Sequence, residues 1–254
     1  MKNFFIELQR RNAMLSIAGW ICFVAAIVCA VLTQVTDTTV LGINAFIKPM
    51  KFFSSIWIFT WSMAWYLEYL HKRRDTVFYS IMVLIVFSYE MLVITWQAAN
   101  GRLSHFNITS PLYALLFNLM GIAIIILWTW TLYVTILFFR KKQFDIPNSY
   151  LWGIRCGLVI FLIFSMEGAF MVLQLTHTVG GPDGGPGLPV VNWSTQHGDF
   201  RVAHFFGMHA LQIIPILSYY YIRKSGWVLL FTTFYFILVS SLFVQALNRI
   251  PLFF

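Results

Sequence analysis

Seven long apolar runs follow one another along the chain, and each is long enough to cross a bilayer as an α-helix. They cover about residues 13–35, 49–70, 77–100, 111–139, 150–176, 200–222 and 226–248. None alternates apolar and polar residues as the strands of a membrane barrel do. The sequence therefore predicts an all-α integral membrane protein, with residues 1–254 forming a single seven-transmembrane-helix bundle.

The composition agrees with a membrane protein and argues against a nucleic-acid partner. Hydrophobic residues make up 59% of the chain and charged residues 10%, whereas soluble chains carry about 25% charged residues. The net charge of +8 would suggest nucleic acid in a soluble protein, but here the basic residues form short clusters between apolar runs. We expect the lipid bilayer as the main partner, and homo-oligomers remain possible.

The basic residues also predict the orientation, because cytoplasmic loops are enriched in lysine and arginine. With seven spans, one side holds Lys2, Arg10, Arg11, Lys72, Arg73, Arg74, Arg140, Lys141, Lys142, Arg155, Arg223 and Lys224. The other side holds Lys48, Lys51, Arg102, Arg201 and Arg249. This split predicts a cytoplasmic N-terminus and an extracytoplasmic C-terminus, in a multi-pass protein of a bacterial-type plasma membrane.

Three ionisable residues share one predicted depth below the outer face. With a rise of about 1.5 Å per residue, Glu90 lies about 15 Å down, and Glu167 and His209 about 14 Å down. Ionisable groups inside a membrane are costly, and they usually face the bundle interior and serve a function. We expect these three side chains to converge on one buried site that opens to the extracytoplasmic side. The plainer alternative is that neighbours neutralise each group and merely hold the helices together.

Two carboxylates and an imidazole allow several kinds of chemistry. They suit a transition metal, and they can also store or relay protons or bind a polar ligand. The favoured hypothesis is a metal- or haem-dependent enzyme in which Glu90, Glu167 and His209 are the catalytic residues and the metal ligands. The alternative is a proton-coupled carrier, or a receptor for a small polar ligand, without metal. GxSxG, Walker A and CxxCH motifs are absent, which excludes the reactions that depend on them.

Further polar residues lie near the same outer half of the spans. The residues expected to contact a cofactor are His105, His204 and Gln212. Those expected to line a path for a small-molecule substrate or ligand are Lys51, Gln97, Arg102, Gln174, His197, Asp199 and Arg201.

The connection between the fifth and sixth runs is long and rich in glycine and proline, and loops of this length are commonly functional. We expect residues 178–199 to form an ordered cap, with Asp199 accepting hydrogen bonds from the first amides of the next helix. His71 and His177 are expected to be solvated.

Overall fold

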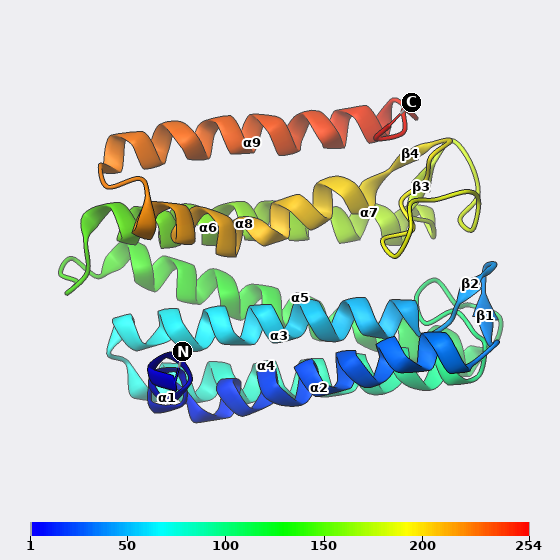
Figure 1. The fold of residues 1–254 in the computed structure, drawn as a ribbon, viewed down its shortest axis with the longest axis horizontal. Coiled ribbons are helices and arrows are strands. Elements are labelled where there is room, and N and C mark those ends of the chain that lie inside the picture. Colours follow the sequence, from blue (N-terminus) through cyan, green and yellow to red (C-terminus); the bar gives the residue numbers. More distant parts are fainter. Residues whose placement is uncertain (1, 254) are drawn as a thin grey trace. The chain divides into compact units, whose positions relative to one another are not determined.

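A computed structural model describes residues 2–253 of the chain, and it is built almost entirely of helices (Figure 1). The helices are α1 (Lys2–Arg11), α2 (Ala13–Val35), α3 (Ile47–Leu67), η1 (Glu68–Leu70), α4 (Arg73–Ala99), α5 (Pro111–Arg140), α6 (Asn148–Ser165), α7 (Glu167–Gln174), α8 (Phe200–Tyr220) and α9 (Ser225–Leu247). The short strands are β1 (Thr39–Val40), β2 (Ile43–Asn44), β3 (Thr178–Val179) and β4 (Gly198–Asp199).

Helices occupy all seven of the predicted runs, so the all-α membrane-type fold is confirmed. Six helical segments are long and apolar enough to cross a bilayer, and one of them is α6 and α7 taken together. The remaining predicted span is α3, which is less apolar because it carries Lys48, Lys51 and several serines and tryptophans. The exact number of seven spans, the single domain and the orientation stay predictions.

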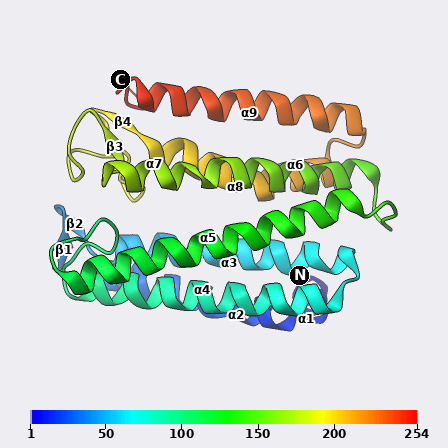
Figure 2. The same ribbon diagram turned by 180° about the vertical axis from the view of Figure 1, so that it is seen from behind.

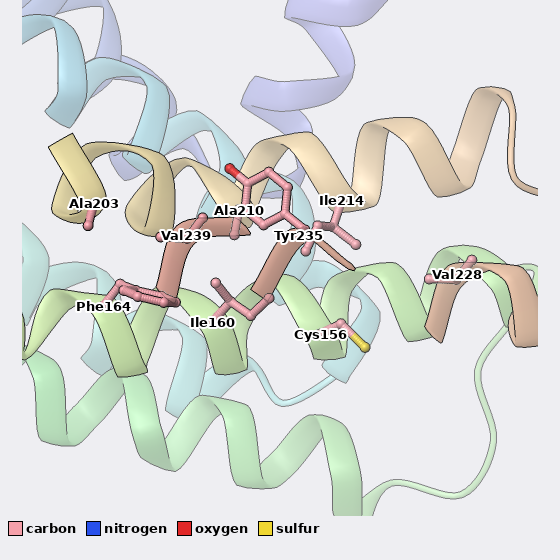
Figure 3. Packing of buried hydrophobic residues seen from close by; sticks show 9 residues of the cluster. All are labelled: Cys156, Ile160, Phe164, Ala203, Ala210, Ile214, Val228, Tyr235 and Val239. Atoms are coloured by element: carbon pink, nitrogen blue, oxygen red, sulfur yellow. The ribbon is translucent and has the colours of Figure 1, made fainter. Parts of the chain in front are cut away.

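The chain divides into two compact units, residues 1–131 and 132–254. In the first unit, Tyr89 of α4 donates a hydrogen bond to the carbonyl oxygen of Leu116 in α5 at 3.1 Å, and the two helices are seen together in Figure 2. The buried core of this unit comprises Ile56, Met91, Val93, Ile94 and Met120. In the second unit, Cys156, Ile160 and Phe164 of α6 pack with residues of α8 and α9 (Figure 3).

Glycines allow α6 and α8 to approach each other closely. A Cβ atom added to Gly157 would lie 2.9 Å from the carbonyl oxygen of Ala210 and 3.3 Å from the Cα atom of Leu211. A Cβ atom on Gly207 would collide with the side chain of Phe164. Small residues serve this purpose in membrane helix pairs, because close backbone contact replaces the hydrophobic driving force that lipid does not supply.

This contact gives a first prediction. The Gly157→Leu substitution should destabilise the protein by about 1–3 kcal/mol, the cost of overpacking a filled interior. Thermal unfolding of the purified protein in detergent measures the change. Gly121→Leu in α5 is the matched control, because a Cβ atom there meets no atom within 4 Å. Equal melting temperatures for the two variants would contradict the close packing of α6 on α8.

The two units repeat the same order of elements. In each, a long helix is followed by a pair of short antiparallel strands and then by two further helices: α2, β1, β2, α3 and α4 in the first unit, and α6–α7, β3, β4, α8 and α9 in the second. The first strand is Thr-Val both times, and its threonine pairs with an acid or amide, Thr39 with Asn44 and Thr178 with Asp199. The helices α3 and α8 that follow have 21 residues each.

Side-chain details repeat as well. The Oδ1 atom of Asn44 accepts from the amide of Phe46 at 2.9 Å, and the Oδ1 atom of Asp199 accepts from the amide of Arg201 at 3.0 Å. The helices α4 and α9, which end the two repeated sets of elements, both finish in Gln-Ala-x-Asn, at residues 97–100 and 245–248. Both asparagines are C-caps whose Nδ2 atoms donate to the carbonyl oxygen four residues earlier, at 2.7 and 2.8 Å. These shared details of pairing and capping give the two sets of elements the same local arrangement.

Candidate functional site

In the first unit, Glu90 and Gln97 lie on one stripe of α4, two turns apart. Their exposed fractions are 3% and 1%, and one side-chain oxygen of each has no hydrogen-bond partner among residues 2–253. Lys48 of α3 lies close enough for its positive charge to act on the Glu90 carboxylate. Buried polar atoms are normally paired, so these unpaired oxygens make the stripe a candidate site.

Three predicted residues lie nearer the ends of the helices of this unit. Lys51 is partly buried in the first turns of α3. Arg102 is exposed just after α4, with its guanidinium 5.1 Å from the ring centroid of Tyr113. His105 is bonded through Nδ1 to the Ser104 hydroxyl at 3.0 Å and packs against Phe52. These contacts place polar groups at the same end of the unit as Gln97.

In the second unit, Glu167 is the first residue of α7, directly after a one-residue break in the α-helical hydrogen-bond pattern at Met166, whose backbone angles stay right-handed helical (φ −68°, ψ −15°). Its exposed fraction is 4%, and neither carboxylate oxygen has a hydrogen-bond partner among the described residues. The sequence did not predict this break. A helix break inside a membrane is tolerated where neighbouring groups take up the freed backbone hydrogen bonds, and such places commonly bind ligands or ions.

His204 of α8 is the residue that takes up one of these backbone groups. Its Nδ1 atom donates to the carbonyl oxygen of Phe164 at 2.9 Å, and its ring lies beside Gly168, the residue after Glu167. A donor at Nδ1 leaves Nε2 of the neutral ring as a lone pair that can take a proton or a ligand. The imidazole of His204 therefore lies beside the irregularity at Met166, which directly precedes Glu167.

His209 lies five residues further along α8. Its Nδ1 atom is 3.3 Å from Oε1 of Gln212, and its ring packs against Phe205 with centroids 4.3 Å apart. The roles predicted for His209 and Gln212 stay predictions. Gln174, expected to line the path of a substrate or ligand, is exposed in the last turn of α7.

The start of α8 is fixed by Asp199, as the sequence predicted. Asp199 is the N-cap, and its carboxylate also accepts from Nε of Arg201 at 2.9 Å and from the amide of Ser194 at 2.8 Å. His197 is partly buried and packs on Gly181, within the same connection. Trp193 packs against Phe205 of α8 with ring centroids 5.5 Å apart, which holds the connection against the helix.

Asp183 organises the other half of this connection. Its carboxylate accepts from the hydroxyl of Thr178 at 2.7 Å and from that of Thr176 at 2.9 Å, and it forms an ion pair with Nδ1 of His177 at 2.6 Å. The expectation of a solvated His177 is therefore wrong, because a carboxylate six residues away folds back onto it. Burial raises the pKa of Asp183, but the hydrogen bonds and charge of His177 outweigh it and hold that pKa below its usual range.

A second prediction concerns this loop. Asp183→Asn should open residues 178–199 to proteases, because the amide loses the ion pair and most of the accepted hydrogen bonds. The stabilisation from a carboxylate whose pKa is lowered by folding is present above its ordinary value of 3.8 and is lost as pH falls further. Limited proteolysis at neutral pH measures the cleavage rate. Asp145→Asn, in another connection, is the control, and equal rates for both variants would contradict an ordered cap.

The described residues do not supply a metal centre. Among residues 2–253, no group of three or more histidine, cysteine, aspartate or glutamate side chains is placed to hold a metal ion. Glu90 belongs to the first unit, and Glu167 and His209 belong to the second. The predicted convergence of the three and the predicted metal or haem therefore stay predictions. Comparisons with protein-family models, curated proteins and solved structures found no match to this chain.

The repeated order of elements was not predicted, although the sequence contains matching motifs. The repeated Thr-Val dipeptide at residues 39–40 and 178–179 and the repeated Gln-Ala-x-Asn ending align only when gaps are allowed. The main gap is the glycine- and proline-rich stretch between β3 and β4, which has no counterpart between β1 and β2.

Proposed function

We propose that the protein is a seven-span membrane carrier that moves a small polar solute together with protons. The observation that carries the proposal is the repeated set of three helices. Many secondary carriers are built from internal repeats, and the fifth apolar run here also has a local irregularity at Met166, next to Glu167. One repeat can then rock against the other during transport, which a structural or receptor role does not require.

The proton would be carried by the buried glutamates. Each unit holds one glutamate in the middle of an apolar helical segment, Glu90 or Glu167. An ionised carboxylate without partners is costly in an apolar interior, whereas the protonated form is much less so. A solute that binds can bring water or a hydrogen-bond donor to the carboxylate. Its binding or release therefore changes the proton affinity of the carboxylate.

The polar residues around the glutamates supply groups for recognition of the solute. In the first unit these are Lys48 and Gln97, and in the second they are His204, His209 and Gln212. Arg102, His105, His197 and Arg201 lie in or beside the connections at the ends of the helices. If these connections are extracytoplasmic, the solute enters from the outside, as the basic residues predict.

Seven spans require that α3 crosses the membrane. Its 21 residues are about 32 Å long at a rise of about 1.5 Å per residue, which matches the hydrocarbon core. Within the first unit α3 runs along the length of α2, and the short connection η1 leads directly into α4 (Figure 1). If α2 and α4 both cross the bilayer, α3 must cross it as well.

A third prediction tests this topology. Reporter domains fused after Lys72, Lys142 and Lys224 should report the cytoplasm, and a reporter at Gly185 should report the outside. The reason is that the basic residues cluster at the connections that contain these three lysines. Compartment-specific activity of the reporters gives the answer. A cytoplasmic signal at Gly185 would overturn the proposed topology.

Elemental analysis and an optical spectrum of the purified protein separate the carrier from the metal- or haem-dependent enzyme. A carrier should contain no metal or chromophore in stoichiometric amount. A stoichiometric metal or a haem spectrum that is lost in Glu167→Gln would favour the enzyme and contradict the proposed function.

A further inference from the structure

A groove lies where α8 ends and α9 begins in the second unit. Its volume is about 780 Å³, and its lining includes Tyr221, Arg223, Lys224, Trp227, Phe231 and Phe234. Aromatic and aliphatic side chains form most of the lining, and the two cations lie together in the turn between the helices. The groove is remote in sequence from the residues proposed to carry protons.

The apolar wall of the groove faces outward from α9. The exposed fractions of Trp227 and Phe234 are 61% and 64%, and with Leu230 they repeat every three to four residues along one face of the helix. Phe234 lies nine residues after the first residue of α9, Ser225, so this face reaches about 14 Å along the helix. In a membrane protein, such a face meets the acyl chains of lipids.

The charged end of the groove has a different character. Arg223 and Lys224 lie in the turn before α9, and no acidic side chain among the described residues forms an ion pair with either. Tyr219, Tyr220 and Tyr221 directly precede them. Tyrosine and tryptophan gather at the level of lipid headgroups, so this turn is at the membrane–water interface.

We propose that this groove is a binding site for one anionic phospholipid. The phosphate of the headgroup would bind Arg223 and Lys224, and an acyl chain would lie against Trp227 and Phe234. A zwitterionic lipid brings its own cation next to its phosphate and leaves the two basic side chains uncompensated. The charge of the turn and the apolar wall together therefore favour an anionic lipid, independently of the transport function.

Native mass spectrometry of the full chain, in detergent with equal amounts of phosphatidylglycerol and phosphatidylcholine, tests the proposal. We expect bound phosphatidylglycerol to exceed phosphatidylcholine in the wild type. Arg223→Gln with Lys224→Gln should weaken phosphatidylglycerol binding by about 30-fold, because each cation near an anionic lipid contributes about 1 kcal/mol. Arg73→Gln with Arg74→Gln is the matched control, since these exposed cations are the first two residues of α4, the equivalent helix of the other repeat.

Two further measurements separate a lipid site from a site for phosphate alone. Phe234→Ala should reduce the retained phosphatidylglycerol while leaving the fold intact, because its side chain is mostly exposed. Glycerol phosphate, which has the headgroup charge without acyl chains, should not displace the lipid at equal concentration. Equal retention of both lipids by the wild type, equal losses in the two double variants, or displacement by glycerol phosphate would overturn the proposal.

Discussion

Replacing Glu167 with glutamine is expected to abolish proton coupling while the protein still folds, and Glu90→Gln is expected to do the same. Glutamine keeps the shape of the side chain but cannot bind and release a proton. Both carboxylates are buried, and each has an oxygen without a hydrogen-bond partner among the described residues. Solute-driven proton uptake into proteoliposomes measures the loss, which should reach the background of empty vesicles.

Glu68→Gln is the control for this experiment. Glu68 is also a glutamate of the first unit, but its side chain is 35% exposed and lies 3.7 Å from Arg10 at a helix end. Surface ion pairs contribute about 0–1 kcal/mol, so this variant should transport and melt like the wild type. Melting temperatures of all three variants show whether loss of transport is a loss of folding. Full proton coupling in Glu167→Gln would remove that residue from the mechanism.

Asp199→Ala is expected to cause the largest loss of stability of any single substitution in the loop. Asp199 is 2% exposed, caps α8, and neutralises Arg201 while accepting from the amide of Ser194. Breaking a buried ion pair costs about 3–5 kcal/mol, and the lower end applies because the Arg201 side chain is 26% exposed. Thermal unfolding in detergent should therefore show a loss of about 3 kcal/mol.

The repeated order of elements supplies an internal comparison for this substitution. Asn44 occupies the equivalent position in the first unit and accepts from the amide of Phe46, but it has no charge to neutralise. Asn44→Ala should cost about 1 kcal/mol, because it removes the hydrogen bonds of the Asn44 side chain with the Phe46 amide and the Thr36 carbonyl. Similar losses in the two variants would show that the Asp199–Arg201 pair adds nothing to the cap.

The helices were predictable because each depends on a local property, the length of an apolar run. The start of α8 was also predictable, since an aspartate before an apolar run accepts from the first amides wherever the helix leads. The break at Met166 was not predictable, because no proline marks it. It is accompanied by a tertiary contact, the hydrogen bond from His204 to the Phe164 carbonyl, which comes from a different helix.

The candidate site was predicted only in part, for the same reason. Depth along a helix identified Glu90 and Glu167 as buried, and both are. Depth does not specify which side of a helix faces its neighbours or where the helix ends, so Gln174 was expected to line a ligand path but is exposed at the end of α7. The pairing of His177 with Asp183 depends on a turn of the loop, which apolar periodicity does not describe.

The most direct test of the carrier is the internal pH of proteoliposomes when small polar solutes, such as amino acids, sugars and carboxylic acids, are added outside in turn. The account predicts that at least one solute acidifies the interior with the wild type and that none does so with Glu167→Gln or Glu90→Gln. A solute that acidifies the interior equally with the wild type and with both glutamine variants would contradict it.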